Sequence, residues 1–310
     1  MLATQDTTGG TAHNPGDLID GIGIQSGDNS KYNNFGELLP ASIRGQVFAD
    51  LNGNNELDAG ETLLNGVTLY LLDSEGNRVG STTTNSNGKY AFTNLKPGVY
   101  GIEEIQPAGY LEGANRVGSA GGDLDGVNRI LKAQLSSGAD GINYDFWEVV
   151  PAKISGYVFQ DGPTITVKKG EATPYIPSVR DGKLTSDDKR LAGVTLQLCD
   201  GSGYPLSDSN GNPITTVTDA NGYYEFTMLR PGVYSIVETQ PSGYIQGVDS
   251  VGSNGGLVVN QYASIGASVL STLAVDPKGS AIVLITVQPG EAAVEYNFSE
   301  VLVKSEGTPG

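Results

Sequence analysis

One segment of the chain has oxygen-bearing side chains at the spacing of a calcium-binding loop. It runs from Asp50 to Glu61, with acid or amide side chains at positions 1, 3, 5, 9 and 12 and a backbone carbonyl expected at position 7. The predicted ligands are Asp50, Asn52, Asn54, the carbonyl of Glu56, Asp58 and Glu61. Asn55 stands where such loops carry glycine, and two neutral asparagine ligands should lower the affinity. We predict a Ca²⁺ site here; the alternative is an Asx-rich surface turn that binds nothing.

A second group of acids follows the matching strand in the later part of the chain. Asp161 takes the first position of the loop, but an insertion over residues 162–180 separates it from the acids that follow. Asp161, Asp181 and Asp188 could converge on a second cation, with the backbone carbonyl of Lys183 as a further ligand. Whether this group binds calcium is left open by the sequence. The insertion is expected to be a solvated loop or a surface excursion that contacts a neighbour.

The charge balance favours cations as partners. The chain has 18 Lys and Arg residues against 35 Asp and Glu residues, a formal charge of −17, which repels nucleic-acid phosphates and anionic membranes. Its one cysteine, Cys199, cannot form an intrachain disulfide. No apolar run reaches the roughly 18 residues that a membrane span needs. We therefore expect no nucleic-acid binding and no membrane span.

The elements that must position these acids are strands. The chain has 44 glycines and 15 prolines, and only 17% of its residues are charged, which favours short strands joined by turns. Val67, Leu69 and Leu71 alternate with other residues at the period of a half-buried strand. Asn87-Gly88 predicts a tight hairpin turn with both residues at positive φ, and Pro97-Gly98 predicts a type II turn. Several short strands at this spacing indicate an all-β sandwich.

A duplication organises the whole chain. Six segments recur in the same order: 42–50 as 153–161, 65–69 as 192–196, 87–93 as 221–227, 95–100 as 229–234, 106–110 as 240–244 and 143–146 as 295–298. We predict two tandem β-sandwich domains in a rod, over residues 41–150 and 151–303, with residues 304–310 as a tail. The short proline-containing joint at 150–152 should restrict hinge motion between them.

The first 40 residues contain a fragment of the same repeat. Residues 33–41 match residues 144–152 position for position, so this stretch reads as the closing strand of a module. We expect residues 1–40 to be the partial closing strand of a preceding repeat, cut from a longer array; the alternatives are a linker or a strand donated to a neighbour. The first six residues lack the basic and apolar regions of a secretory signal. An exported chain would therefore be one whose signal was removed, or a fragment.

The ordered motifs resemble the SdrD B-like domain, a relative of the Cna B-type domain. Its Gly-x-Val-Phe-x-Asp, calcium-like loop, Asn-Gly-x-Tyr-x-Phe, Leu-x-Pro-Gly-Val-Tyr and final Tyr-x-Phe motifs occur twice, within residues 42–303. The resemblance implies a prealbumin-like, Ig-like sandwich, calcium-dependent rigidity, export, and a stalk or spacer role in adhesin-like surface proteins. It implies no catalysis.

Some Cna B-type relatives carry a Lys-to-Asn isopeptide bond promoted by a buried acid. Glu104 and Glu238 lie where that acid could be, and Asn297 is in the last strand. The expected first strands contain no lysine, since Lys153 precedes its strand, and Asp145 replaces the asparagine in the first repeat. We therefore expect no isopeptide bond.

Three classes of function are considered for a chain with these features: a structural repeat, a fibre subunit and an enzyme. The first is a calcium-stabilised structural repeat of a secreted or cell-surface adhesin-like bacterial protein, whose partners are neighbouring repeats, copies of itself, or an extracellular protein or carbohydrate. The alternative is a subunit of an extracellular fibre that polymerises by strand donation from the N-terminal segment. An enzyme is not expected, because no nucleophile, base and orienting group recur together.

Overall fold

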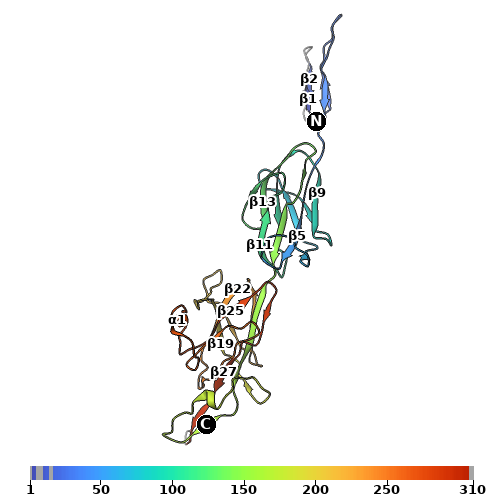
Figure 1. Ribbon diagram of the computed structural model, residues 1–310. Helices are drawn as coiled ribbons and strands as arrows, with labels where there is room; N and C mark the ends of the chain where they lie inside the picture. Colours follow the sequence, from blue (N-terminus) through green and yellow to red (C-terminus); the bar gives the residue numbers. More distant parts are fainter. Residues whose placement is uncertain (1, 5–9, 14–16, 307–310) are drawn as a thin grey trace. The chain divides into compact units, whose positions relative to one another are not determined.

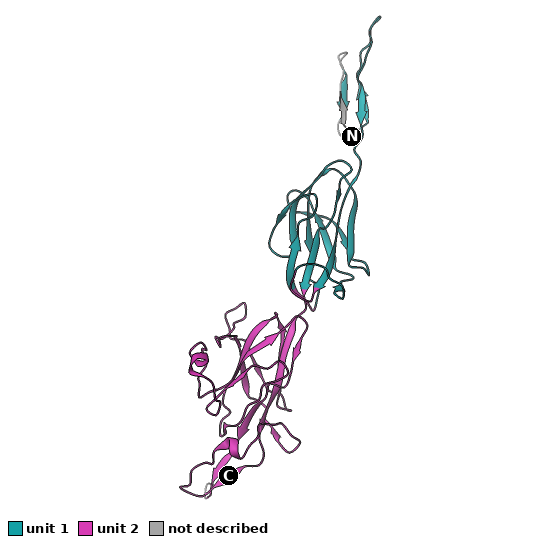
Figure 2. Cartoon of the chain, in the orientation of Figure 1, with its two compact units in different colours: residues 1–49, 55–108, 112–148 teal, residues 50–54, 109–111, 149–310 magenta. Residues whose placement is uncertain are grey.

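The computed structural model describes residues 2–4, 10–13 and 17–306, and its regular elements are almost all β-strands (Figure 1). Contacts between Cα atoms divide the chain into two compact units (Figure 2). Unit 1 comprises Met1–Ala49, Asn55–Ala108 and Glu112–Glu148, and unit 2 comprises Asp50–Asn54, Gly109–Leu111 and Val149–Gly310. The main division therefore falls two residues before the predicted boundary at residue 150.

Two sheets build unit 1. The five-stranded sheet has the order β12 (Asp123–Leu124), β13 (Arg129–Leu135), β10 (Gly98–Glu104), β7 (Thr68–Leu72) and β8 (Arg78–Thr83). The six-stranded sheet has the order β11 (Leu111–Arg116), β15 (Asp145–Val149), β5 (Ala41–Asp50) and β14 (Asp140–Gly141), and β6 (Thr62–Leu63) and β9 (Lys89–Leu95) also pair with β5. The last strand, β15, thus lies beside the first strand, β5.

Both sheets contribute apolar side chains to the core of unit 1. Leu69 and Ile102 come from the five-stranded sheet, and Ile43, Phe48 and Phe146 from the six-stranded sheet; all five are fully buried. Burial alternates from Thr68 to Leu71 of β7, because every second side chain of a strand points to the same face, but Leu72 at the end of the strand is buried as well. The predicted all-β fold class is confirmed, with two tandem sandwiches.

Unit 2 repeats this architecture. Its six-stranded sheet has the order β18 (Lys189–Arg190), β16 (Ala152–Gln160), β27 (Phe298–Val301) and β23 (Ile245–Gln246), with β21 (Tyr223–Leu229) and β26 (Ala292–Ala293) also paired to β16. Its five-stranded sheet has the order β20 (Thr215–Val217), β19 (Thr195–Asp200), β22 (Gly232–Glu238), β25 (Ser280–Val287) and β24 (Leu257–Val259). The first and last strands, β16 and β27, pair in parallel, with Val158 opposite Phe298. One buried apolar cluster joins side chains of both sheets.

Unit 2 has two excursions that unit 1 lacks. The insertion at 162–180 contains β17 (Ile165–Val167) and a short 3₁₀ helix, η1 (Ile176–Ser178). β17 pairs in parallel with β28 (Val303–Ser305), so a strand crosses the predicted boundary between domain and tail because the insertion supplies it with a partner. The second excursion, between β24 and β25, carries α1 (Ala267–Leu270), and Tyr262 within it packs edge-on against Tyr175 of the insertion, 5.8 Å between ring centres.

The N-terminal segment forms two small antiparallel sheets of two strands each. β2 (Thr11–His13) pairs with β3 (Leu18–Asp20), and β4 (Asn34–Gly36) pairs with β1 (Leu2–Thr4). The side chains of β4 are exposed, unlike those of the matching strand β15. Residues 1, 5–9 and 14–16 of the predicted segment 1–40, and residues 307–310 of the predicted tail, lie outside the described residues.

The turn predictions were wrong in type. Gly88 has φ +65°, but Asn87 is not at positive φ, and the turn leads from β8 of one sheet to β9 of the other instead of closing a hairpin. Gly88 is needed because a Cβ there would lie 2.5 Å from the Val47 carbonyl oxygen. Gly98 is not at positive φ either, so Pro97-Gly98 is not a type II turn.

Candidate metal centre

The first predicted cation loop connects two adjacent antiparallel strands. β5 ends at Asp50, and Phe48 and Ala49 of β5 pair with β6, which begins just after Glu61. This pairing holds the two ends of the loop close together. Asp50 is 3% exposed, and its Oδ1 accepts hydrogen bonds from the backbone N–H groups of Asn52 (3.1 Å) and Gly53 (2.7 Å). The first predicted ligand is therefore fixed at the base of the loop.

The rest of the loop has the backbone form that its spacing suggests. Asn52 Oδ1 accepts from the Asn54 N–H at 3.0 Å, and Glu61 Oε2 accepts from the Asp58 N–H at 3.0 Å. Asn55 has φ +63°, the left-handed conformation for which calcium loops use glycine and which asparagine tolerates better than most residues. The departure at position 6 is thus compatible with the turn that the loop needs.

Two side chains from distant strands of unit 1 contact the part of this loop around Asn55 and Glu56. The Arg116 guanidinium lies 2.9 Å from Glu56 and 2.6 Å from the buried carboxylate of Asp145. Trp147 Nε1 donates to Asn55 Oδ1 at 2.9 Å, and its ring stacks on Phe48. The Glu56 carboxylate is thus paired with Arg116, and the role of the Glu56 carbonyl in the predicted site stays a prediction.

The second predicted group of acids is drawn together in unit 2. Asp161 Oδ2 accepts from the Gly182 N–H at 2.9 Å, and Asp188 Oδ1 accepts from the Gly162 N–H at 2.8 Å. Burial raises the pKa of Asp161, the Gly182 hydrogen bond lowers it, and the nearby carboxylates of Asp188 and Asp181 raise it. The three predicted aspartates are therefore neighbours.

Thr185 and Lys183 contribute backbone N–H groups to the hydrogen bonds of this second loop. Thr185 donates its N–H to Asp188 at 2.7 Å, and the Lys183 N–H donates to Asp181 Oδ1 at 3.1 Å. No group of three or more His, Cys, Asp or Glu side chains in the part of the chain that the structure describes is arranged to hold a metal ion. Both predicted sites also rely on amide and carbonyl oxygens, and both stay predictions.

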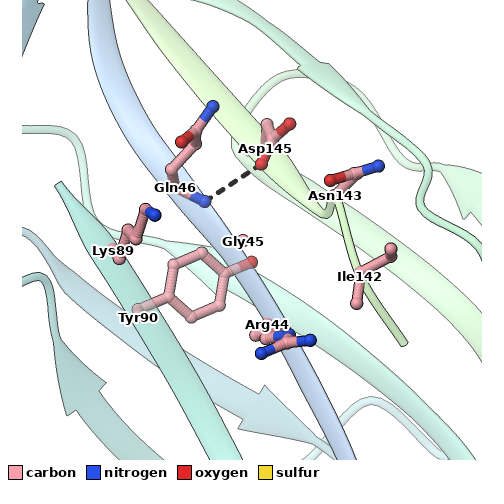
Figure 3. Close-up of a pocket in the computed structure, with 8 residues that line it drawn as sticks. All are labelled: Arg44, Gly45, Gln46, Lys89, Tyr90, Ile142, Asn143 and Asp145. Carbon is pink, nitrogen blue, oxygen red and sulfur yellow. Dashed lines mark hydrogen bonds between the residues drawn. The ribbon is translucent and has the colours of Figure 1, made fainter. Parts of the chain in front are cut away.

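A surface pocket of about 260 Å³ lies beside the closing strand of unit 1 (Figure 3). Its lining residues are Arg44, Gly45, Gln46, Lys89, Tyr90, Ile142, Asn143 and Asp145. The Gln46 N–H donates to Asp145 Oδ1 at 3.0 Å, and Arg116 occupies the other oxygen of that carboxylate. The pocket therefore offers charged and amide groups that are already paired in part, and no nucleophile beside a base.

The two acids discussed for an isopeptide bond are buried in the sandwiches. Glu104 is 3% exposed and Glu238 is 5% exposed. The pKa of each is raised by burial and then by the charge of a second glutamate in the closing strand, Glu148 for Glu104 and Glu300 for Glu238. Sequence reasoning located the first member of each pair and missed the second, although Glu148 and Glu300 occupy matching positions of the repeat.

The chain matches one protein family twice. The family model described as the SdrD B-like domain matches residues 41–146 and 176–282. Serine-aspartate repeat-containing protein C of Staphylococcus aureus strain Newman is 31% identical to the chain over 231 residues, which is 74% of this chain and 21% of that protein. The version in strain N315 is 30% identical over the same length. The chain thus spans about a fifth of the length of these relatives.

Solved structures of pilins show a weak similarity. The minor pilin GBS52 of Streptococcus agalactiae is 15% identical, with a TM-score of 0.32, over 88% of this chain and 99% of that one. The shaft pilin spaA of Lactobacillus rhamnosus GG is 11% identical, with a TM-score of 0.31, over 88% and 100%. Among residues 2–4, 10–13 and 17–306, no helix has the length and apolar character of a membrane span.

Proposed function

Because the chain belongs to the SdrD B-like domain family, we propose that it is a calcium-stabilised spacer in a secreted or cell-surface adhesin-like bacterial protein. The duplication carries this proposal: two sandwiches of one family follow each other, and only residues 150 and 151 separate β15 from β16. Repeats that follow each other so directly are what a spacer requires. The expected partners of the chain are neighbouring repeats, copies of itself, or an extracellular protein or carbohydrate.

Calcium would act where the first two strands of each sandwich are joined. In the first loop, Asp50, Asn52, Asn54, Asp58 and Glu61 would supply side-chain oxygens and Glu56 its carbonyl; in the second, Asp161, Asp181 and Asp188 would supply carboxylates and Lys183 its carbonyl. A bound divalent cation would offset the repulsion among these carboxylates. Since an ion that binds only the folded state shifts the unfolding equilibrium, it would raise the stability of the domain that holds it.

Thermal melts in calcium and in chelator test this role. Saturating calcium, at about a hundred times its dissociation constant, should stabilise the wild-type chain by about 2.7 kcal/mol. The variant Asp58→Ala with Glu61→Ala should lose the part of the shift that comes from unit 1. The matched control is Asp17→Ala with Glu75→Ala, which removes two exposed acids outside both loops and should respond like wild type. Superimposable wild-type melts in calcium and in chelator would contradict the proposal.

A second candidate function follows from the exposed strand β4. The side chains of Phe35 and Leu38 are each 48% exposed, and Leu39 is 66% exposed, whereas the matching strand β15 is buried along most of its length. A strand with this pattern can complete the sheet of another molecule. We propose, as the alternative, that the N-terminal segment is donated to a neighbouring copy in an extracellular fibre.

A further inference from the structure

Each sandwich buries a pair of glutamates that belong to its two different sheets. In unit 1, Glu104 ends β10 of the five-stranded sheet and Glu148 lies in β15 of the six-stranded sheet. In unit 2, Glu238 ends β22 and Glu300 lies in β27, at the matching positions. Glu148 and Glu300 are fully buried. The pairs therefore lie inside each sandwich, where its sheets face each other.

The surroundings of the pair are also duplicated. Each first glutamate begins a Glu-x-Gln-Pro sequence, at 104–107 and 238–241. The glutamine amide of that sequence donates a hydrogen bond to the second glutamate, Gln106 to Glu148 and Gln240 to Glu300. The same three-residue arrangement thus occurs in both domains, although the domains differ in their loops and insertions.

The hydrogen bonding of the pairs is incomplete when both members are ionised. Both carboxyl oxygens of Glu104 and of Glu238 are buried without a hydrogen-bond donor, and so is one oxygen each of Glu148 and Glu300. Two carboxylates cannot donate to each other, and their like charges repel in a medium of low dielectric constant. One proton placed between them supplies the missing donor and removes one of the two charges.

We propose that the Glu104–Glu148 pair of unit 1 holds a single shared proton, so that a carboxyl–carboxylate hydrogen bond joins the two sheets and makes the stability of this sandwich proton-dependent. This inference goes beyond the spacer function and does not depend on calcium. It assigns a role to two buried acids that neither predicted cation site uses.

No Lys, Arg or His side chain of the described residues is among the groups that mainly shift the pKa values of these glutamates. In unit 1 the charge of Glu148 acts on Glu104, and the charge of Glu112 acts on Glu148. Burial, and then the charges of Asp145 and Glu104, raise the pKa of Tyr90. In unit 2 the charges of Glu300 and Asp249 act on Glu238. Burial, and then the charge of Glu238, raises the pKa of Tyr224. Asp249 is itself buried, and accepts hydrogen bonds from Gln246, Asn260, Ser280 and Ser299.

The direction of the pH effect follows from these surroundings. Burial, and then the charge of Glu148, raises the pKa of Glu104 from 4.5 to about 9, and burial raises the pKa of Glu148 to about 7. The folded state therefore binds more protons than the unfolded chain between these values. The stabilisation is fully present below 4.5 and is lost as the pH rises through 7 to 9.

A carboxyl ¹³C NMR titration of the full chain, labelled at glutamate Cδ and kept in chelator, reads the proton directly. We expect resonances from buried glutamates whose shift changes only above about pH 6.5, well above the ordinary glutamate range. In Glu104→Gln the resonances assigned to unit 1 should lose this late transition, because the amide donates to Glu148 without a titrating proton. If every glutamate resonance of the wild type completes its titration below about pH 5.5, the proposal is overturned.

Melting curves of the same proteins give a second readout. One proton bound in the folded state alone makes the wild-type melting temperature of unit 1 fall by about 5 °C for each pH unit between about pH 7 and pH 9, where the pair holds a single proton. Glu104→Gln should flatten this slope, while the exposed control Glu75→Gln should keep it. Equal slopes in Glu104→Gln and Glu75→Gln contradict the shared proton. The result is independent of calcium, so it can fail while the spacer proposal stands.

Discussion

At the scale of single residues, the two repeats differ in a correlated way at one buried contact. In unit 1, Asp145 accepts from the Gln46 N–H and forms an ion pair with Arg116. At the matching positions of unit 2, Asn297 Oδ1 accepts from the Tyr157 N–H at 2.9 Å, and Ser250 takes the place of the arginine. The charge and its partner have changed together, because a buried carboxylate needs a cation that a buried amide does not.

This correlation predicts the behaviour of exchanged residues. Arg116→Ser alone should destabilise unit 1 by about 2 kcal/mol, below the roughly 3–5 kcal/mol of fully buried pairs, because the Arg116 side chain is 36% exposed and partly screened by water. Adding Asp145→Asn, which reproduces the pair found in unit 2, should restore most of the loss. Urea unfolding of both single variants and the double variant gives the coupling energy, and additive losses would count against the explanation.

At the scale of elements, the closing strand lies directly on a glycine of the first strand. A Cβ on Gly45 of β5 would lie 1.7 Å from the Tyr144 carbonyl oxygen, and one on Gly156 of β16 would lie 1.8 Å from that of Tyr296. The same carbonyls accept hydrogen bonds from the hydroxyl groups of Tyr90 and Tyr224, at 2.6 and 2.7 Å. The approach of first and last strands therefore depends on the absence of a side chain at one position.

Gly45→Ala should consequently be strongly destabilising. The added methyl group collides with backbone, which cannot move aside without separating β5 from β15, so we expect a loss of about 3 kcal/mol or more. Gly98→Ala is the matched control, because its Cβ would make only an ordinary contact of 3.5 Å with Tyr100. Chemical denaturation compares the two; similar small losses in both variants would show that the strands can separate cheaply.

The strands were predictable from the sequence and the contacts between them were not. Alternation along β7 and the ordered duplication indicated the elements because both are local or repeated patterns. The turn after β8 was misread because its form depends on the chain crossing to the other sheet, which no dipeptide reports. Arg116 and Trp147 reach the first loop from far along the chain, so spacing within the loop could not reveal them. Arg116 could have been found by comparing the two repeats. Where unit 1 has Asp145 and Arg116, unit 2 has Asn297 and Ser250.

At the scale of the whole molecule, the N-terminal segment decides between a spacer and a fibre subunit. Leu39 is held by the turn after β13, since its N–H donates to Ser137 Oγ at 2.9 Å and its carbonyl accepts from the Gly138 N–H at 3.1 Å. The preceding strand β4 pairs only with β1 among the described strands. The core of each sandwich is built without residues 1–40, so neither fold should depend on them.

Light scattering on the full chain and on a chain without residues 1–40 separates these functions. For a spacer, we expect both proteins to be folded and to keep the same mass at all concentrations. For a strand donor, the full chain should grow in mass with concentration while the shortened chain stays monomeric, because the exposed edge and its apolar side chains then enter another copy. Circular dichroism of the shortened chain checks that its sheets remain.

The parallel pairing of β16 with β27 has a mechanical consequence for unit 2. The chain enters this sandwich at the start of β16, and the end of β27 leads into β28, which pairs with β17 of the insertion. β16 and β27 run in the same direction side by side. A pull that draws these two ends apart slides one strand along the other and loads their hydrogen bonds together in shear. An antiparallel pair pulled from the adjacent ends of its strands would instead open one bond at a time. We therefore expect the hydrogen bonds between β16 and β27 to make unit 2 resistant to stretching.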